Sequence, residues 1–229
     1  MTDLFAVSLL EENDFEACKG ALLAVTPEAT RQKVASFARS NDAQRSLLGE
    51  VLIRHLISEI SGSKLPDHPF STGEKGKPAP EGYRGIHFNI SHSGRWVVVA
   101  LSTDIVGVDV ERMLKVPEGV AHRFFSESEN KMLQNATDDG QKADIFFTLW
   151  TIKESFLKAI GKGLTKSLSS FTVVQTGDHH FSLTNDPEAE GFHLRVFELS
   201  EGYKLAVCAR DNQFCENINV MNISELASL

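Results

Sequence analysis

The sequence predicts an α+β fold, because segments with the apolar spacing of helices alternate with short strand-like runs along its 229 residues. Neighbouring strand-like runs are joined by short turns, which favours antiparallel pairing. A turn at residues 102–104 divides the chain into two parts that each contain helices and strands. We therefore expect two domains, formed by residues 1–103 and residues 104–229.

The first part contains one well-marked helix, expected over residues 42–60. Its apolar residues recur every three or four positions, Asn41 or Asp42 is placed to cap its start, and Ser61-Gly62-Ser63 ends it. The stretch from residue 65 to residue 85 is rich in Pro, Gly and charge, so it predicts a loop with short strands.

A hairpin is expected where the two parts meet. Residues 96–101 and residues 105–110 are apolar, β-branched runs, and Ser102-Thr103-Asp104 supplies the turn between them. Helices are then expected at about 118–136 and 142–160, the second ended by glycines. Further strands are expected at residues 170–175, 181–183, 193–199 and 203–209.

The composition excludes several classes of protein. Hydrophobic residues make up 41% and charged residues 24%, as in soluble globular proteins, and no apolar run approaches the roughly 18 residues that span a bilayer. The first residues lack the basic start of a signal peptide, and three cysteines without a CxxC pair suit a reducing cytoplasm. A net charge of −8 argues against general nucleic-acid binding.

The most informative segment is Gly107-Val108-Asp109-Val110-Glu111. Residues two apart in a strand point to the same face, so Asp109 and Glu111 project together while the valines form the opposite face. Gly107 lies on the carboxylate side, and a mid-strand glycine often marks the close approach of a ligand. Acidic pairs at this spacing are also common on solvated strands, which is the simpler interpretation of the two carboxylates alone.

A second motif lies about forty residues further on, in the predicted helix from Trp150 to Lys158. Glu154 and Lys158 are one helical turn apart, so in isolation they are best explained as a surface salt bridge. If the helix packs against the strand, three carboxylates and one cation converge. Oxygen ligands suit Mg²⁺, with Mn²⁺ as a substitute, and this combination indicates chemistry on a phosphate ester.

Four other residues have both a structural and a functional interpretation. His92, in a Ser- and Arg-rich turn, is either a structural histidine or a donor to phosphate, and Lys77 is either a solvated loop lysine or a nucleotide contact. Lys153 lies near the apolar stripe of its helix, where its stem can be buried while its head reaches a ligand. Glu129 follows Ser126 at capping-box spacing, which favours a helix cap.

Taken together, these motifs resemble the 4′-phosphopantetheinyl transferases, specifically the surfactin-synthetase-activating class. The two family signatures are a G-(I/V)-D-(I/V/L)-E strand and a W-(S/T)-x-K-E-(A/S)-x-x-K helix, and they correspond to residues 107–111 and 150–158. The resemblance extends from about residue 26 to the C-terminus, with further matching segments at residues 42–50, 76–78, 88–96, 123–126 and 202–208.

This resemblance implies a fold, a reaction and a partner. The expected fold is a monomer of two similar α+β halves, related by a pseudo-twofold axis, with the active site in the cleft between them. The expected reaction moves the phosphopantetheine arm of coenzyme A to a serine of an apo carrier protein and releases adenosine 3′,5′-bisphosphate. The carrier could belong to nonribosomal peptide, polyketide, siderophore or fatty-acid synthesis, and antibiotic biosynthesis is one such setting.

The resemblance also assigns roles to residues. Asp109, Glu111 and Glu154 are the expected Mg²⁺ ligands, and Lys158 the lysine beside the pyrophosphate. The general base is one of three candidates, namely Glu129, Glu154 or a metal-bound water. The residues expected to contact coenzyme A are His92, Lys77, Arg45, Ser91 and, at the 3′-phosphate, Lys33 with Arg31.

Two other functions are compatible with the carboxylates. A Mg²⁺-dependent hydrolase of nucleotide diphosphates would use the same residues but would release free phosphopantetheine. A module that only binds coenzyme A or carrier proteins has little need for the complete set of three carboxylates and a lysine.

Overall fold

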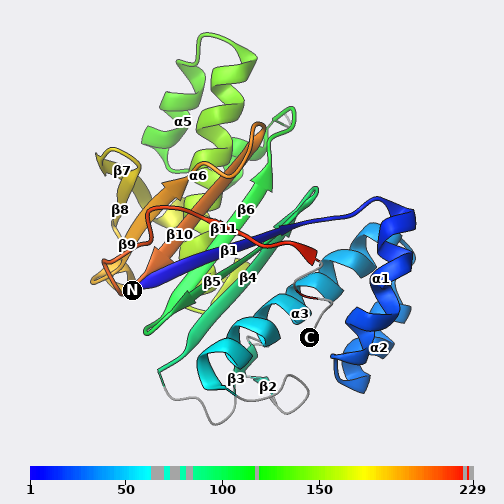
Figure 1. Ribbon diagram of the computed structural model, residues 1–229. Coiled ribbons are helices and arrows are strands. Elements are labelled where there is room, and N and C mark those ends of the chain that lie inside the picture. The colour runs from blue at the N-terminus through cyan, green and yellow to red at the C-terminus, as the bar shows by residue number, and fades with distance from the viewer. Residues whose placement is uncertain (63–69, 73–77, 81–84, 117–118, 224–225, 227–229) are drawn as a thin grey trace.

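Two β-sheets, each packed against one long helix, form the core of the molecule (Figure 1). The structure is a computed structural model that describes residues 1–229 apart from 63–69, 73–77, 81–84, 117–118, 224–225 and 227–229. One apolar core lies between the first sheet and helices α1–α3, and another lies between the second sheet and α5–α6. A third core lies between the two sheets, so the α+β fold is layered as helix, sheet, sheet, helix.

The first sheet has the strand order β11-β1-β5-β4 and the second the order β6-β10-β9-β8-β7. The strands of the first sheet are β1 (Thr2–Ser8), β4 (His87–Ser93), β5 (Trp96–Ser102) and β11 (Asn219–Val220). The strands of the second sheet are β6 (Val106–Arg112), β7 (Thr172–Gly177), β8 (His180–Thr184), β9 (His193–Phe197) and β10 (Tyr203–Ala209). A separate two-stranded ribbon is formed by β2 (Phe70–Thr72) and β3 (Pro78–Pro80).

The helices also divide between the two halves. The first half contains α1 (Glu12–Ala24), α2 (Glu28–Ala35) and α3 (Ser40–Ser61), and the second contains α4 (Val120–Phe124), α5 (Glu127–Gln134) and α6 (Asp139–Ala159). Short 3-10 helices are present at Gly163–Thr165, Leu168–Ser170 and Pro187–Ala189. None of the helices in the described part of the chain is both long enough and apolar enough to cross a membrane.

Helix α3 confirms the prediction for residues 42–60 but begins slightly earlier. Arg39 precedes its first turn without a side-chain cap, so neither Asn41 nor Asp42 is the N-cap. Gly62 adopts a left-handed φ of 66° at its end, as a C-terminal glycine should.

The single helix predicted over residues 118–136 is wrong, because the structure has two helices there. Helix α4 ends at Phe124, and α5 begins after Ser126, whose extended backbone starts a complete capping box with Glu129. The capping box formed by Ser126 and Glu129 therefore marks the start of a second helix and does not lie within a single long one. Helix α6 confirms the prediction for residues 142–160 and starts three residues earlier, after the N-cap Asp138.

The predicted hairpin between residues 96–101 and 105–110 is also wrong. Strand β5 pairs with β1 and β4, whereas β6 pairs antiparallel with β10, so the turn between them leads from one sheet into the other. Both segments are strands, but their partners lie far away in the sequence. The four later strands fall within two residues of their predicted limits.

The two sheets are joined by side chains where β4 lies beside β6. The side-chain oxygens of Asn89, Ser91 and Ser93 accept hydrogen bonds from the backbone N–H groups of Val108, Val110 and Arg112, at 2.9, 3.2 and 3.0 Å. These alternate residues replace the carbonyl groups that a neighbouring strand would supply. Three backbone N–H groups on this edge of β6 are therefore satisfied by side chains of β4 instead of by backbone carbonyls.

The end of the chain returns to the first half. Strand β11 pairs parallel with β1, the N–H of Cys215 donates to the carbonyl of Thr2, and Ile223 lies in the core beside α3. The boundary between residues 103 and 104 therefore separates the strands of the two sheets, with one exception: β11 follows the boundary in the sequence but belongs to the first sheet. Sequence reasoning did not identify β1, α1, α2 or β11.

Candidate active site

A pocket of about 300 Å³ lies where β4 of the first half meets β6 and α6 of the second. It is lined by six of the residues singled out in the sequence, together with one apolar and one aromatic side chain. These residues are Ser91, His92, Asp109, Glu111, Glu154 and Lys158, with Ile90 and Trp150. The two acidic motifs are thus brought together, at the boundary between the halves.

Gly107 allows helix α6 to lie directly on strand β6. A Cβ atom added at this position would overlap the backbone carbonyl oxygen of Ser155 and the backbone nitrogen of Ala159. The space in front of Gly107 is therefore filled by the helix, and the expectation that a ligand occupies it is wrong. This close approach places Glu154 and Lys158, on the same helix, beside the carboxylates of β6.

Asp109 is the most buried of the three carboxylates, with 4% of the residue exposed. Its Oδ1 lies 2.6 Å from the ammonium of Lys158 and accepts a hydrogen bond from the Ser91 hydroxyl at 3.1 Å. Its Oδ2 is buried and has no hydrogen-bond partner within the part of the chain that the structure describes. Burial raises the pKa of Asp109, and Lys158 and Ser91 oppose that rise.

Glu111 on β6 and Glu154 on α6 are half-buried and line the same pocket. Ser93 donates a hydrogen bond of 2.7 Å to Glu111 Oε2, whereas Glu154 Oε1 is buried and has no hydrogen-bond partner among the residues described. Burial raises the pKa of Glu154 to about 7, with Asp109 and Glu111 adding to the rise and Lys158 opposing it. Burial also raises the pKa of Glu111, and Ser93 opposes that rise.

The donor set fits a hard divalent cation. Two buried carboxylate oxygens, on Asp109 and Glu154, have no hydrogen-bond partner among the described residues, and all three acidic side chains offer oxygen ligands. Within the described residues, no three His, Cys, Asp or Glu side chains already surround one point as metal ligands would. The carboxylates share a pocket, and Lys158 supplies the positive charge at Asp109.

Ser91 and His92 lie on neighbouring positions of β4 but have different surroundings. The Ser91 hydroxyl is buried and accepts hydrogen bonds from the Lys158 ammonium at 2.9 Å and the Val110 N–H at 3.2 Å. His92 is exposed at the mouth of the pocket, where partial desolvation lowers its pKa and the nearby Arg45 and Lys158 lower it further.

Arg45 lines an adjacent cavity of about 520 Å³ together with Arg95 and Arg112. Its guanidinium donates to the carbonyl of Gly94 at 2.7 Å and pairs with Asp42. The predicted coenzyme A contact at Arg45 therefore borders the carboxylate pocket without lining it.

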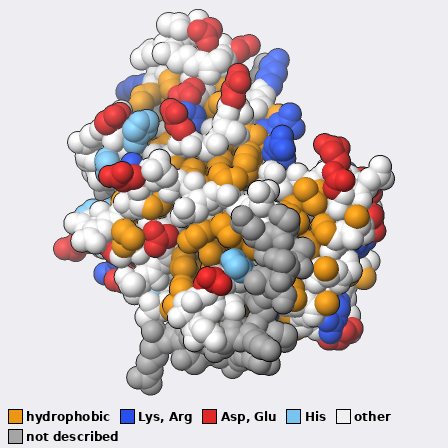
Figure 2. All heavy atoms as spheres, in the orientation of Figure 1, with side chains coloured by type: hydrophobic (Ala, Val, Ile, Leu, Met, Phe, Trp, Pro, Cys, Tyr) orange, Lys and Arg blue, Asp and Glu red, His pale blue; other side chains and the backbone are white. Residues whose placement is uncertain are grey.

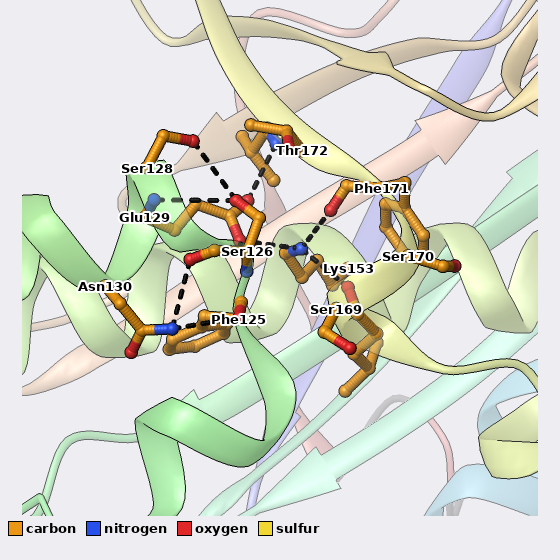
Figure 3. A network of polar contacts seen from close by, with 12 residues as sticks. Phe125, Ser126, Ser128, Glu129, Asn130, Lys153, Ser169, Ser170, Phe171 and Thr172 are labelled. Carbon is orange, nitrogen blue, oxygen red and sulfur yellow. Dashed lines mark hydrogen bonds and ion pairs between the residues drawn. The ribbon is translucent and has the colours of Figure 1, made fainter.

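Glu129 and Lys153 form a fully buried ion pair outside the carboxylate pocket, with 2.8 Å between Lys153 Nζ and Glu129 Oε2 (Figure 3). The Glu129 carboxylate also accepts from the N–H of Ser126 at 2.7 Å and from that of Val173 at 2.8 Å. The predicted capping box is thus confirmed.

The Lys153 ammonium donates to the carbonyls of Leu168 and Phe171 at 2.7 and 2.6 Å. It has no exposed surface, and burial lowers its pKa. In this arrangement its head ties α6 to the segment before β7 and does not reach the carboxylate pocket. Lys153 and Glu129 are therefore paired with each other in this structure, and neither is among the residues that line the carboxylate pocket.

The cations expected at the 3′-phosphate are not part of the pocket lining. Lys33 is exposed on α2, and Arg31 uses its guanidinium to hold the carbonyls of Leu23 and Thr26 at the turn between α1 and α2. Lys77 lies outside the described residues.

Sequence reasoning missed Ser93 as a partner of the site. The signal that could have identified it is the polar alternation of Asn89, Ser91 and Ser93 along a strand. Such alternation is normally attributed to solvent, but here these side chains face a second sheet.

The pocket between the two halves combines three carboxylates with a lysine, a donor set that suits a divalent cation and a phosphate ester. The N-terminal model of 4′-phosphopantetheinyl transferases matches residues 15–104, and the model of the 4′-phosphopantetheinyl transferase superfamily matches residues 105–208. The chain belongs to the 4′-phosphopantetheinyl transferase family. Members of this family transfer phosphopantetheine to carrier proteins.

Named relatives match over almost the whole chain. The 4′-phosphopantetheinyl transferase Sfp of Bacillus subtilis (strain 168) is 40% identical over 202 residues, which is 88% of this chain and 89% of that protein. The enzyme psf-1 of Bacillus pumilus is 35% identical over 98% and 97% of the two chains, and gsp of Aneurinibacillus migulanus is 35% identical over 90% and 86%. The crystal structure of Thermotoga maritima holo-[acyl-carrier-protein] synthase (AcpS) covers 45% of this chain and 61% of that one, with a TM-score of 0.38 and 23% identity.

Proposed function

We propose that this chain transfers the 4′-phosphopantetheine arm of coenzyme A to a serine of apo carrier proteins, with Mg²⁺ held by Asp109, Glu111 and Glu154. The observation that carries the metal assignment is that one buried carboxylate oxygen on Asp109 and one on Glu154 have no hydrogen-bond partner among the described residues, in a pocket where Lys158 pairs with Asp109. Protein carboxylates left buried without a partner are costly, so a ligand that satisfies them is expected. Mn²⁺ suits the same oxygen donors.

The proposed reaction forms one bond and breaks one bond. The serine oxygen of the carrier attacks the phosphorus that bears the pantetheine arm, and the bond to the bridging oxygen of the diphosphate breaks. Adenosine 3′,5′-bisphosphate leaves with the electron pair, and the serine proton passes to a base. A bound divalent cation would offset the negative charge of the diphosphate.

Lys158 is the cation of the chain that stabilises the leaving group. Its side chain is 28% exposed and lines the pocket, and its ammonium is held by Asp109 and Ser91 at 2.6 and 2.9 Å. A cation fixed in this way can donate to the oxygen that gains charge as the diphosphate bond breaks, without reorganisation at that moment. His92, at the mouth of the same pocket, is placed to donate to a phosphate oxygen.

Glu129 is unsuited to take the serine proton. Its carboxylate is fully buried and is occupied by Lys153, the Ser126 N–H and the Val173 N–H. That leaves the other two candidates, which are a metal-bound water and Glu154, whose Oε1 has no hydrogen-bond partner among the described residues.

The proposed contacts to coenzyme A are supported to different degrees. Ser91 and His92 line the pocket, and Arg45 borders it in the adjacent cavity. Lys33 with Arg31, and Lys77, rest on the resemblance alone. Lys153, by contrast, is proposed as a structural residue because its head is buried against Glu129.

The partner is proposed to be an acyl or peptidyl carrier protein that docks beside the second half. Charged side chains of both signs are scattered over the face in Figure 2, and the chain carries a net charge of −8, so it offers no general attraction to an acidic carrier. Leu114, which is 60% exposed and lies three residues beyond Glu111, offers apolar contact close to the pocket. We also propose that the protein acts as a cytoplasmic monomer, consistent with three free cysteines.

Intact-protein mass spectrometry tests the function directly. An apo carrier domain is incubated with the protein, coenzyme A and Mg²⁺, and with EDTA in the control. The expected result is a metal-dependent mass gain of one phosphopantetheine arm on the carrier serine. Release of free phosphopantetheine without modified carrier would instead support a hydrolase, and bound coenzyme A without any product would support a binding module.

A further inference from the structure

We propose that Ser93 is a positioning residue that orients Glu111 for cation binding; this inference rests on the proposed function of the carboxylate pocket. Ser93 is the last residue of β4, and its hydroxyl spans the junction between the two halves. It does not itself line the pocket, so it would act through Glu111.

The Ser93 hydroxyl makes two hydrogen bonds with opposite roles. It accepts from the N–H of Arg112 at 3.0 Å and donates to Glu111 Oε2 at 2.7 Å. Because the hydroxyl has a single proton, the bond from Arg112 leaves that proton for the carboxylate. The hydrogen bond fixes Oε2 of Glu111. Because the carboxylate group is rigid, this bond also limits the orientations that Oε1 can adopt.

The backbone that carries Ser93 is held from both halves of the molecule. The next residue, Gly94, has a φ of 55°, and its carbonyl accepts from Arg45 at 2.7 Å. The N–H of Arg95 donates to the Tyr203 hydroxyl at 3.0 Å, and a Cβ atom at Gly94 would overlap that hydroxyl. The turn after Ser93 therefore cannot shift without losing contacts to both α3 and β10.

Ser93 can be distinguished from Ser91, which occupies the equivalent position two residues earlier. Ser91 contacts Asp109 and Lys158, so its removal would disturb the expected leaving-group cation as well as a carboxylate. Ser93 contacts one carboxylate and one backbone N–H. Its removal should therefore weaken cation binding while leaving Lys158 in place.

The test measures Mn²⁺ binding by electron paramagnetic resonance in the absence of coenzyme A. For Ser93→Ala we expect the Mn²⁺ dissociation constant to rise about tenfold, as is typical when a partner of a metal ligand is removed. Ser93→Thr keeps the hydroxyl and should restore affinity to within about twofold of wild type. In transfer assays, the Mg²⁺ concentration for half activity should rise for Ser93→Ala more than the KM for coenzyme A.

Ser200→Ala is the matched control at the same junction. Ser200 accepts a hydrogen bond from Trp96 Nε1 at 2.9 Å and is not among the residues that line the pocket. It should bind Mn²⁺ like wild type. If Ser93→Ala binds Mn²⁺ as tightly as wild type, or if Ser200→Ala weakens Mn²⁺ binding equally, the proposed role of Ser93 is wrong, whereas the proposed metal site still stands. Absence of Mn²⁺ binding by the wild-type protein would overturn the proposed metal site and this inference together.

Discussion

Lys158 Nζ lies 2.6 Å from Asp109 Oδ1 and forms the ion pair that joins helix α6 to strand β6 at the pocket. The two partners differ in exposure, because 28% of the lysine side chain is exposed against 5% of the aspartate side chain. The lysine is therefore accessible to a ligand in the pocket while it stays paired, whereas the aspartate is enclosed. This asymmetry suits a site in which the carboxylate holds a cation and the ammonium contacts the substrate.

Asp109→Asn should lower the transfer rate by at least about a hundredfold, because a neutral amide removes both the charge at the cation and the partner of Lys158. The fold should persist, since the amide has nearly the same shape and Lys158 can turn to solvent. Initial rates by mass spectrometry and a thermal melt measure the two effects. Near-normal turnover of Asp109→Asn would refute the metal assignment.

The metal-free protein should lose stability as the pH rises from about 4.5 to about 7. The pKa of Glu154 is raised from 4.5 to about 7, so over this window the folded state retains a proton that the unfolded state releases. A cation that replaces that proton should bind more tightly above pH 7. The melting temperature shift caused by Mg²⁺ should therefore be larger at pH 8 than at pH 6.

Glu154→Gln provides the control for this pH dependence, because it removes the titrating group but keeps the side-chain length. In this variant, the Mg²⁺-induced shift in melting temperature should differ less between pH 6 and pH 8 than it does in the wild-type protein. Equal Mg²⁺ shifts at the two pH values in the wild-type protein would show that Glu154 does not give up a proton on cation binding.

The sequence predicted the elements whose pattern is local. Helix α6 and strand β6 follow from helical spacing and from alternating valines, and these two elements carry the three carboxylates and Lys158. The site could therefore be anticipated before its geometry was known. The buried Glu129–Lys153 pair was not anticipated, because its partners are 24 positions apart and nothing in the local pattern of either residue points to the other.

The local sequence pattern does not show which strands pair with one another. Residues 96–110 have the composition of a hairpin, yet β5 and β6 belong to different sheets. This arrangement is supported by a ladder of side chains from β4, in which Asn89, Ser91 and Ser93 accept from three backbone N–H groups of β6. The ladder depends on tertiary packing, so periodicity alone could not distinguish it from a polar, solvated face.

Gly107→Ala should destabilise the protein by about 1–3 kcal/mol and reduce transfer, because the added methyl group forces helix α6 away from strand β6. Chemical denaturation measures the stability change. Gly20→Ala is the control: Gly20 lies in α1 with no atom within 4 Å of an added Cβ, so the change should be neutral or stabilise by about 0.5–1 kcal/mol. Unchanged stability of Gly107→Ala would contradict the contact between α6 and β6.

Glu129→Gln should separate a structural role from a catalytic one. Breaking a fully buried ion pair costs about 3–5 kcal/mol, so the free energy of unfolding should fall by this amount in Glu129→Gln and also in Lys153→Met. The double variant should lose less than the sum of the two, because no unpaired charge is left buried.

The transfer rate distinguishes the two roles of Glu129. If the carboxylate only holds Lys153 and the start of α5, then Glu129→Gln, assayed well below its melting temperature, should keep a kcat within a few-fold of wild type. Loss of a general base would instead lower kcat by about 10²–10⁴-fold without requiring a change in stability. Such a loss in fully folded Glu129→Gln would return Glu129 to the catalytic machinery, and the buried pair with Lys153 would then have to open during turnover.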